Sequence, residues 1–222
     1  MNGAKVPIKE GQTTGEAVEG FIDKKESERE AESSENESGQ KPDDGAIIRP
    51  TNREAINKEL SELRQLGAST GNEHASIVTE GGEDIARTEG QQEQVVFTRD
   101  MIDMINNSPP NSLVIAHNHP GVGSFSDEDL SFLSYPSVKE IDVVEPNGNH
   151  YTMSVGSGEK PSVSEIMQLG RAVDKAVSAN QVDMIINGKI TPDQAFQRHN
   201  DEKCKIIAME YGWIYERGTI DD

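Results

Sequence analysis

The sequence has a single cysteine, Cys204, in 222 residues. A disulfide within the chain is therefore excluded, and so is a zinc site built from several thiolates. The sequence also lacks any run of about 18 apolar residues, so we expect no membrane span. Its first residues, Met-Asn-Gly-Ala-Lys, lack the apolar core of a secretory signal. We expect a cytoplasmic protein, or one delivered by a route that needs no signal peptide.

Aromatic and basic residues are also few. Aromatic residues make up 5% of the chain and hydrophobic residues 33%, so we do not expect the whole length to pack into a core. Lys and Arg number 21 against 40 Asp and Glu, which gives a formal net charge of −19. Binding to nucleic acid works largely by neutralising phosphates, so we expect no nucleic-acid partner. A basic or neutral protein partner fits better, although the acidity could serve solubility alone.

The composition divides the chain into parts. Residues 1–50 are predicted to be a disordered acidic tail, because Glu26–Gln40 is rich in Glu and Ser and has Ala31 as its one apolar residue. Periodic apolar residues begin near Thr51. Gly, Ser and Pro gather again between Gly156 and Ser162 and predict a hinge. We therefore expect a domain over 51–156 and a helical extension over 157–222 that packs on it.

The alternation of helical and strand patterns predicts an α/β (more narrowly α+β) fold with a mixed sheet. The expected helices start near Thr51 and run to Gln65, then cover 99–106, 128–135, 164–179 and 192 to about 210. In the last of these, Ala195, Phe196, Cys204, Ile207 and Ala208 are expected to face inward. The expected strands cover 73–79, 84–88, 94–97, 113–116, 141–144, 150–155 and 213–215.

The most informative stretch follows the apolar strand 113–116. On a strand, alternate side chains share a face, so His117 and His119 point the same way, roughly 7 Å apart along the chain. Pro120 then ends the strand because it has no N–H for the ladder. After a short glycine-containing turn, the next helix opens with an acidic run that includes Asp129. Two imidazoles and one carboxylate form three corners of a tetrahedral zinc site and leave the fourth open for water, as in catalytic sites.

Each part of this pattern also has a simpler interpretation. A lone histidine on a strand face is usually a core or surface residue. The tetrad Ser126 to Asp129 is close to an ordinary capping box, in which the serine caps the helix and the N3 side chain reaches back. Capping and metal binding are compatible at one helix start. Because the simpler interpretations must explain all the features together, we favour a Zn²⁺ site formed by His117, His119 and Asp129.

At these residues the chain resembles a known family. His-x-His-Pro, a short Gly-containing spacer and Ser-x-x-Asp are similar to the signature of the JAMM (JAB or MPN-plus) zinc metalloproteases. The signature also occurs in the RadC-like branch, where Asn commonly stands between the histidines. The sequence after Asp129 is more similar to JAB-type domains found near phage head proteins and bacterial toxins. The resemblance covers roughly residues 55–156.

The resemblance implies an MPN, cytidine-deaminase-like sheet flanked by helices. It implies zinc-dependent hydrolysis of peptide or isopeptide bonds, with a protein substrate such as a ubiquitin-like conjugate. Glu73 would be the general base that takes a proton from water, and Ser126 would donate a hydrogen bond to the oxyanion. Glu80, at the tip of an expected turn, is the rival base. A solvated charge at a strand end is the alternative for Glu73.

Two other hypotheses remain open. A RadC-like role in DNA metabolism is disfavoured by the acidic balance and by the lack of a basic cluster. A non-catalytic MPN scaffold is disfavoured because scaffolds of that fold usually lose the metal ligands, which this chain retains. The oligomeric state does not follow from the sequence.

Overall fold

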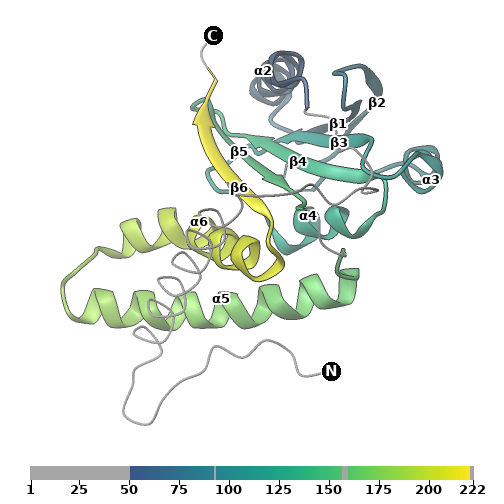
Figure 1. Cartoon of the computed structure of the whole chain (residues 1–222). Coiled ribbons are helices and arrows are strands. Elements are labelled where there is room, and N and C mark those ends of the chain that lie inside the picture. The colour runs from purple at the N-terminus through teal and green to yellow at the C-terminus, as the bar shows by residue number, and fades with distance from the viewer. Residues whose placement is uncertain (1–50, 93, 157–159, 221–222) are drawn as a thin grey trace, which may run out of the picture.

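A computed structural model describes residues 51–92, 94–156 and 160–220 of the chain. The acidic tail expected over 1–50 therefore lies outside the described residues. The described residues build one six-stranded sheet in the order β2-β1-β3-β4-β5-β6 (Figure 1). β3 and β4 run parallel, and the other neighbouring strands run antiparallel. The strands are β1 (His74–Thr79), β2 (Asp84–Glu89), β3 (Leu113–Asn118), β4 (Val138–Val144), β5 (Asn149–Ser154) and β6 (Ile214–Thr219).

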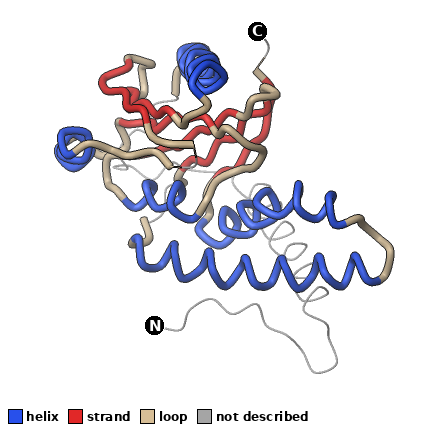
Figure 2. Tube along the Cα trace, turned by 180° about the vertical axis from the view of Figure 1, so that it is seen from behind, coloured by secondary structure: helices blue, strands red, loops and turns tan. Residues whose placement is uncertain are grey.

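Helices cover both faces of this sheet, which confirms the predicted mixed α/β class. α2 lies on one face, and α4, α5 and α6 lie on the other (Figure 1). α5 and α6 run side by side as a helical hairpin (Figure 2). The helices are α2 (Arg53–Thr70), α3 (Arg99–Asn107), α4 (Asp127–Ser131), a 3₁₀ turn (Phe132–Ser134), α5 (Val163–Ile186) and α6 (Pro192–Tyr211).

Alternation along β3 divides the core into two parts. Val114 and Ala116 face α2, whereas Leu113 and Ile115 face the other helices. The smaller cluster, under α2, is formed by Ile56, Leu60, Leu63, Val78, Val114, Ala116, Val144 and Ile220. The larger cluster joins the opposite face of the sheet to α4, α5 and α6 through residues such as Leu130, Ile141, Met153, Ile166, Val173, Val177, Ile207 and Trp213. The C-terminal helices thus share the core of the sheet.

Helix and turn signals in the sequence explain most boundaries. Thr98 caps α3, and Thr191 with Gln194 forms a capping box at the start of α6, followed by Pro192 at the first helical position. Gly212 ends α6 in the left-handed conformation with φ 66°. Among the described residues, no helix combines the length and apolar character that a membrane crossing requires.

Several sequence expectations are wrong; for example, the helix expected over 164–179 runs on to Ile186 as α5. α2, expected to run to Gln65, continues to Thr70, and Gly71 is its left-handed C-cap. The strand expected over 94–97 is reduced to one isolated bridge between Gln91 and Gln94. Phe196, expected to face inward from α6, is 75% exposed. The apolar pattern of a short segment or a single residue did not reveal which neighbours tertiary packing would supply.

Candidate metal centre

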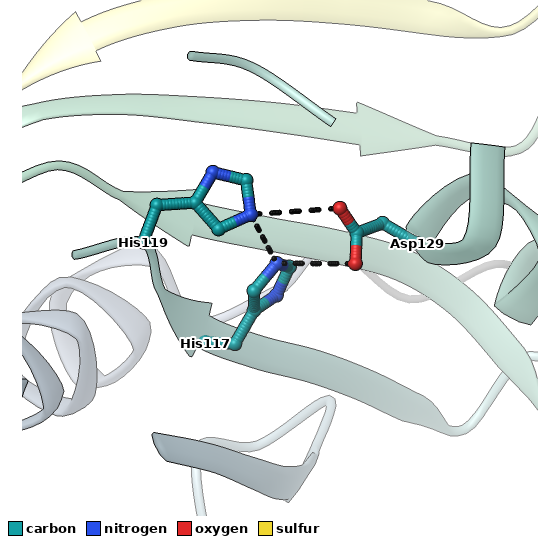
Figure 3. Close-up of side chains that lie close together, drawn as sticks. All are labelled: His117, His119 and Asp129. Carbon is teal, nitrogen blue, oxygen red and sulfur yellow. Dashed lines mark hydrogen bonds and ion pairs between the residues drawn. The ribbon is translucent and has the colours of Figure 1, made fainter. Parts of the chain in front are cut away.

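The two histidines lie at the end of β3. His117 pairs with Ala75 of β1 and with Val143 of β4, so both flanking strands fix its backbone. One step beyond the strand, the His119 N–H still donates to the Val144 carbonyl at 2.9 Å. The two imidazoles therefore leave the same face of the sheet, as the alternation predicted. Their Nε2 atoms lie 3.1 Å apart (Figure 3).

The carboxylate comes from the first turn of α4. Ser126 and Asp129 form the capping box: the Asp129 N–H donates to Ser126 Oγ at 3.0 Å, and the Ser126 N–H donates to Asp129 Oδ2 at 2.8 Å. This reciprocal pair fixes the rotation of the Asp129 side chain. Its oxygens point at the histidines, with Oδ1 3.4 Å from His117 Nε2 and Oδ2 3.5 Å from His119 Nε2 (Figure 3). Capping and ligand placement therefore occur in the same four residues.

These three side chains fit a tetrahedral metal ion. Bonds of about 2.0–2.1 Å to zinc place neighbouring ligand atoms roughly 3.3 Å apart. The two Nε2 atoms are 3.1 Å apart, and each lies 3.4 or 3.5 Å from a different oxygen of Asp129. Two nitrogens and one oxygen are also the donor types that zinc accepts. Among the described residues, these three form the one group of His, Cys, Asp or Glu that meets such geometry. The spacing and the donor set both suit a bound Zn²⁺.

The electrostatics of the cluster favour a cation. Burial alone would raise the pKa of Asp129, but the two histidines hold that pKa well below its usual value. Burial alone would lower the pKa of His119, but Asp129 and the Gly123 carbonyl raise it. The carboxylate is thus stabilised as an anion, and positive charge is stabilised beside it. A bound divalent cation would also be stabilised by the negative charge of Asp129.

His119 is oriented by its second ring nitrogen. Nδ1 lies 3.0 Å from the Gly123 carbonyl oxygen, which can only accept a hydrogen bond, so Nδ1 carries the proton and Nε2 presents its lone pair. The Gly123 N–H in turn donates to Glu145 Oε1 at 2.6 Å. Glu145 is 2% exposed and also accepts from Tyr151 and Asn149. This chain of contacts holds the loop before α4 against β4 and β5.

Glu73 lies immediately before β1, on the side that faces the histidines. Ala75 stands opposite His117, and Glu73 lies two residues earlier on the same face. Burial raises the pKa of Glu73, while His119 and His117 lower it, which places its carboxylate within electrostatic reach of both rings. The backbone of Val95 also lowers that pKa, although burial dominates and the pKa is raised overall. The structure therefore brings Glu73 into the same site as the ligands.

Glu80 lies elsewhere. Its neighbour Thr79 pairs with Leu113, at the start of β3, whereas the histidines lie at the end of that strand. The Glu80 N–H donates to the Ser112 carbonyl at 3.0 Å, which fixes its backbone at that distant end. Glu80 is therefore not part of the cluster.

All five predicted site residues line one cleft of about 1070 Å³. One wall comes from the segment after β2, with Gln91, Gln92, Gln94, Val95 and Phe97, and another from the loop and helix that carry Asp129. None of the described residues that line the cleft is Lys or Arg, whereas Glu73, Glu128 and Asp129 are acidic. The open side of the His117, His119 and Asp129 cluster thus faces a cleft of this volume.

Of the three remaining histidines, which all lie in the described part of the chain, His74 and His199 have side-chain partners, whereas His150 Nδ1 is buried without a hydrogen-bond partner. His74 points away from the cluster, and its Nε2 is 2.8 Å from Thr70 Oγ1. His199 bridges α5 and α6 through Asp174 and Gln181. Neither lies among the candidate ligands.

Sequence reasoning missed several residues that support the site. Glu145 and Asn118 contact the backbone around it, and Lys203 and Tyr215 reach it from the C-terminal segment. Strand alternation could have shown that Asn118 has a different role from the histidines, because it predicts that the Asn118 side chain lies on the opposite face of the sheet. Nothing in the local sequence links Lys203 to Asp127, 76 positions apart in the printed numbering.

Comparison with other proteins gave no relative: no protein-family model, curated protein or solved structure matches the chain.

Proposed function

We propose that the protein is a zinc-dependent metallohydrolase of JAMM type that cleaves peptide or isopeptide bonds. The observation that carries the proposal is the cluster of His117, His119 and Asp129, each of which offers one ligand atom within 4.8 Å of the other two. Glu73 and Ser126 flank it in the same cleft. The resemblance of the His-x-His-Pro and Ser-x-x-Asp motifs to that family supports the same conclusion, as does the mixed sheet flanked by helices.

In this proposal His117, His119 and Asp129 hold Zn²⁺. When bound, zinc supplies a Lewis acid that polarises a carbonyl and lowers the pKa of a coordinated water to about 7. Glu73 accepts a proton from the attacking water and returns it to the leaving amine as the C–N bond breaks. The half-buried position of its carboxylate beside the histidines suits that exchange.

Ser126 has a proton free for a second role. Its Oγ accepts the capping hydrogen bond from the Asp129 N–H, which leaves the hydroxyl hydrogen to be donated. Ser126 lines the cleft, so we propose that it donates to the oxygen that gains negative charge. Loss of one such donor typically costs on the order of a hundredfold in kcat. Ser126→Thr, which keeps the hydroxyl and the cap, is the matched control for Ser126→Ala.

The substrate class in this proposal is a protein segment, with a ubiquitin-like conjugate as the leading candidate. A cleft whose described lining has three acidic residues and no basic one suits neutral or basic chains and disfavours phosphate-rich ligands. The lining therefore favours the peptidase proposal over a RadC-like role in DNA metabolism.

The test compares zinc-loaded wild type with Glu73→Gln on three probes: a diubiquitin isopeptide, a random-sequence peptide library and denatured casein. We expect metal-dependent cleavage by wild type and a rate lower by about 10²–10⁴ for Glu73→Gln, with its zinc content unchanged. Full activity of Glu73→Gln would contradict the base assignment. Absence of cleavage of all three probes by the loaded wild type would contradict the proposed hydrolase.

A further inference from the structure

Asn118 stands between the two candidate ligands, but its side chain lies on the opposite face of the sheet, under α2. It is 2% exposed. Its Oδ1 accepts a hydrogen bond from the His74 N–H at 2.8 Å, and its Nδ2 donates to the Asn72 carbonyl at 3.2 Å. These two backbone groups immediately precede and follow Glu73. The Asn118 side chain therefore forms hydrogen bonds with the backbone on both sides of Glu73, the proposed base.

We propose that Asn118 is a positioning residue, which holds the backbone of Glu73 so that its carboxylate is presented to the metal centre. This inference rests on the proposed function. In this proposal, one face of β3 carries the histidine ligands, and the other face carries Asn118, which positions Glu73. The backbone on either side of Glu73 is thus hydrogen-bonded to β3, the strand that carries His117, and these bonds fix the distance between Glu73 and His117.

The chemistry of the contact selects asparagine. The His74 N–H can only donate and the Asn72 carbonyl can only accept, so the side chain must offer one acceptor and one donor. The carboxamide satisfies both groups, and these partners fix which way it points. Aspartate would set a second oxygen against the Asn72 carbonyl. Leucine, of similar size, would leave both buried backbone groups unpaired.

Glu73 itself bonds on its other side. Its N–H donates to the Gln91 carbonyl at 3.0 Å, and its carbonyl accepts from the Gly90 N–H at 2.8 Å. The segment is thus held between the loop after β2 and Asn118. Removal of the Asn118 contact frees one side and leaves the other, so we expect a displaced carboxylate in a folded protein.

Gly67 of α2 gives Asn118 its space. A Cβ at this position would overlap Asn118 Nδ2, so the helix can approach the amide only because residue 67 has no side chain. Elsewhere in a helix, Gly→Ala stabilises by about 0.5–1 kcal/mol. Here we expect Gly67→Ala to push the amide away and to reproduce the effect of Asn118→Leu. This gives a second variant that leaves residue 118 intact.

The experiment uses Asn118→Leu, Asn118→Asp and Gly67→Ala, with Val114→Ala as the control. Val114 lies on the same face of β3, is fully buried under α2 and belongs to the apolar cluster there. Three quantities are measured: zinc affinity against a competing chelator, kcat and KM for zinc-dependent hydrolysis of 4-nitrophenyl acetate, and hydrogen exchange of the His74 amide in the metal-free protein.

We expect kcat to fall by about 10–100-fold in the three variants, with KM and zinc affinity as in Val114→Ala. The His74 amide should exchange faster than in the control, because its acceptor is lost or displaced. In a Glu73→Gln background, Asn118→Leu should cause no further fall in kcat. A purely structural role would lower kcat equally in Val114→Ala and would persist in that background.

The inference is overturned if Asn118→Leu retains the kcat of the control, or if it lowers kcat as much with Glu73→Gln as without it. If wild type and Asn118→Leu hydrolyse the ester equally well, the inference is overturned and the proposed function stands. A zinc-loaded wild type that hydrolyses neither the ester nor any of the three peptide and protein probes overturns the proposed function and this inference with it.

Discussion

Breaking an ion pair between α6 and α4 by removing one partner should destabilise the protein strongly. Lys203 Nζ lies 3.1 Å from Asp127 Oδ1, and the two side chains are 7% and 15% exposed. Asp127 is the first residue of α4, two positions before the candidate ligand Asp129. Gly170 of α5 lies so close that a Cβ there would overlap the Asp127 carboxylate. The C-terminal helices therefore enclose this carboxylate, and Lys203 supplies its countercharge.

Lys203→Met keeps the length of the side chain and removes the charge. Breaking a buried ion pair by losing one partner costs 3–5 kcal/mol, because a charge is left unpaired away from water. Since Asp127 retains some exposure, we expect the lower end, about 3 kcal/mol of unfolding free energy. For a chain of this size that is a fall in Tm of roughly 6–12 °C. Urea denaturation of the metal-free protein measures the loss directly.

Two further variants separate the ion pair from general packing. In Lys203→Met with Asp127→Leu no charge is buried, so we expect much of the lost free energy to return. Lys205→Met removes a pair with Asp201 on the same helix in which the lysine is 53% exposed, and it should cost less than about 1 kcal/mol because the lysine remains largely in water. A loss below about 1 kcal/mol for Lys203→Met, or a double variant less stable than the single one, would refute the reasoning.

Two other predictions concern buried carboxylates. Glu145→Gln places an amide N–H₂ where one of three donors needs an acceptor. We expect a loss of about 1–3 kcal/mol of unfolding free energy, measured in urea. Because Gly123 also orients His119, zinc should bind about 10–100-fold more weakly. Burial and the neighbouring Asp142 raise the pKa of Glu140 from 4.5 to about 8. Between those pH values the folded protein binds more protons at Glu140 than the unfolded chain, so stability should fall as pH rises from about 4.5 to about 8. Glu140→Gln should flatten that part of the pH–stability profile, and an unchanged slope would contradict the assignment.

The ligands were predictable because their placement is local. A strand period of two aligns His117 with His119, and a capping box fixes Asp129 three residues after Ser126. Such patterns depend on backbone geometry that the sequence encodes within a few residues. The same holds for α6, which begins after the Thr191 cap and ends at the left-handed Gly212. The predicted zinc itself remains a proposal.

The surroundings of the site were not predictable in the same way. The first helix was expected to end at Gln65, two residues before Gly67, because a glycine commonly follows the last turn of a helix. In the structure Gly67 lies inside α2, where its missing side chain admits Asn118. Contacts such as those of Lys203 with Asp127 and of Tyr215 with Ser124 join positions far apart in the sequence. No periodicity reports them, because they arise only when the sheet brings the elements together.

The central claim is tested most directly by metal content. Wild type, His117→Ala and Glu73→Gln are dialysed after zinc loading, and the zinc bound per chain is measured by mass spectrometry. The account predicts about one zinc per chain in wild type and in Glu73→Gln, and its loss in His117→Ala, since three protein ligands define the site. Zinc that fails to bind wild type after it is added back, or that stays bound in His117→Ala, would contradict it.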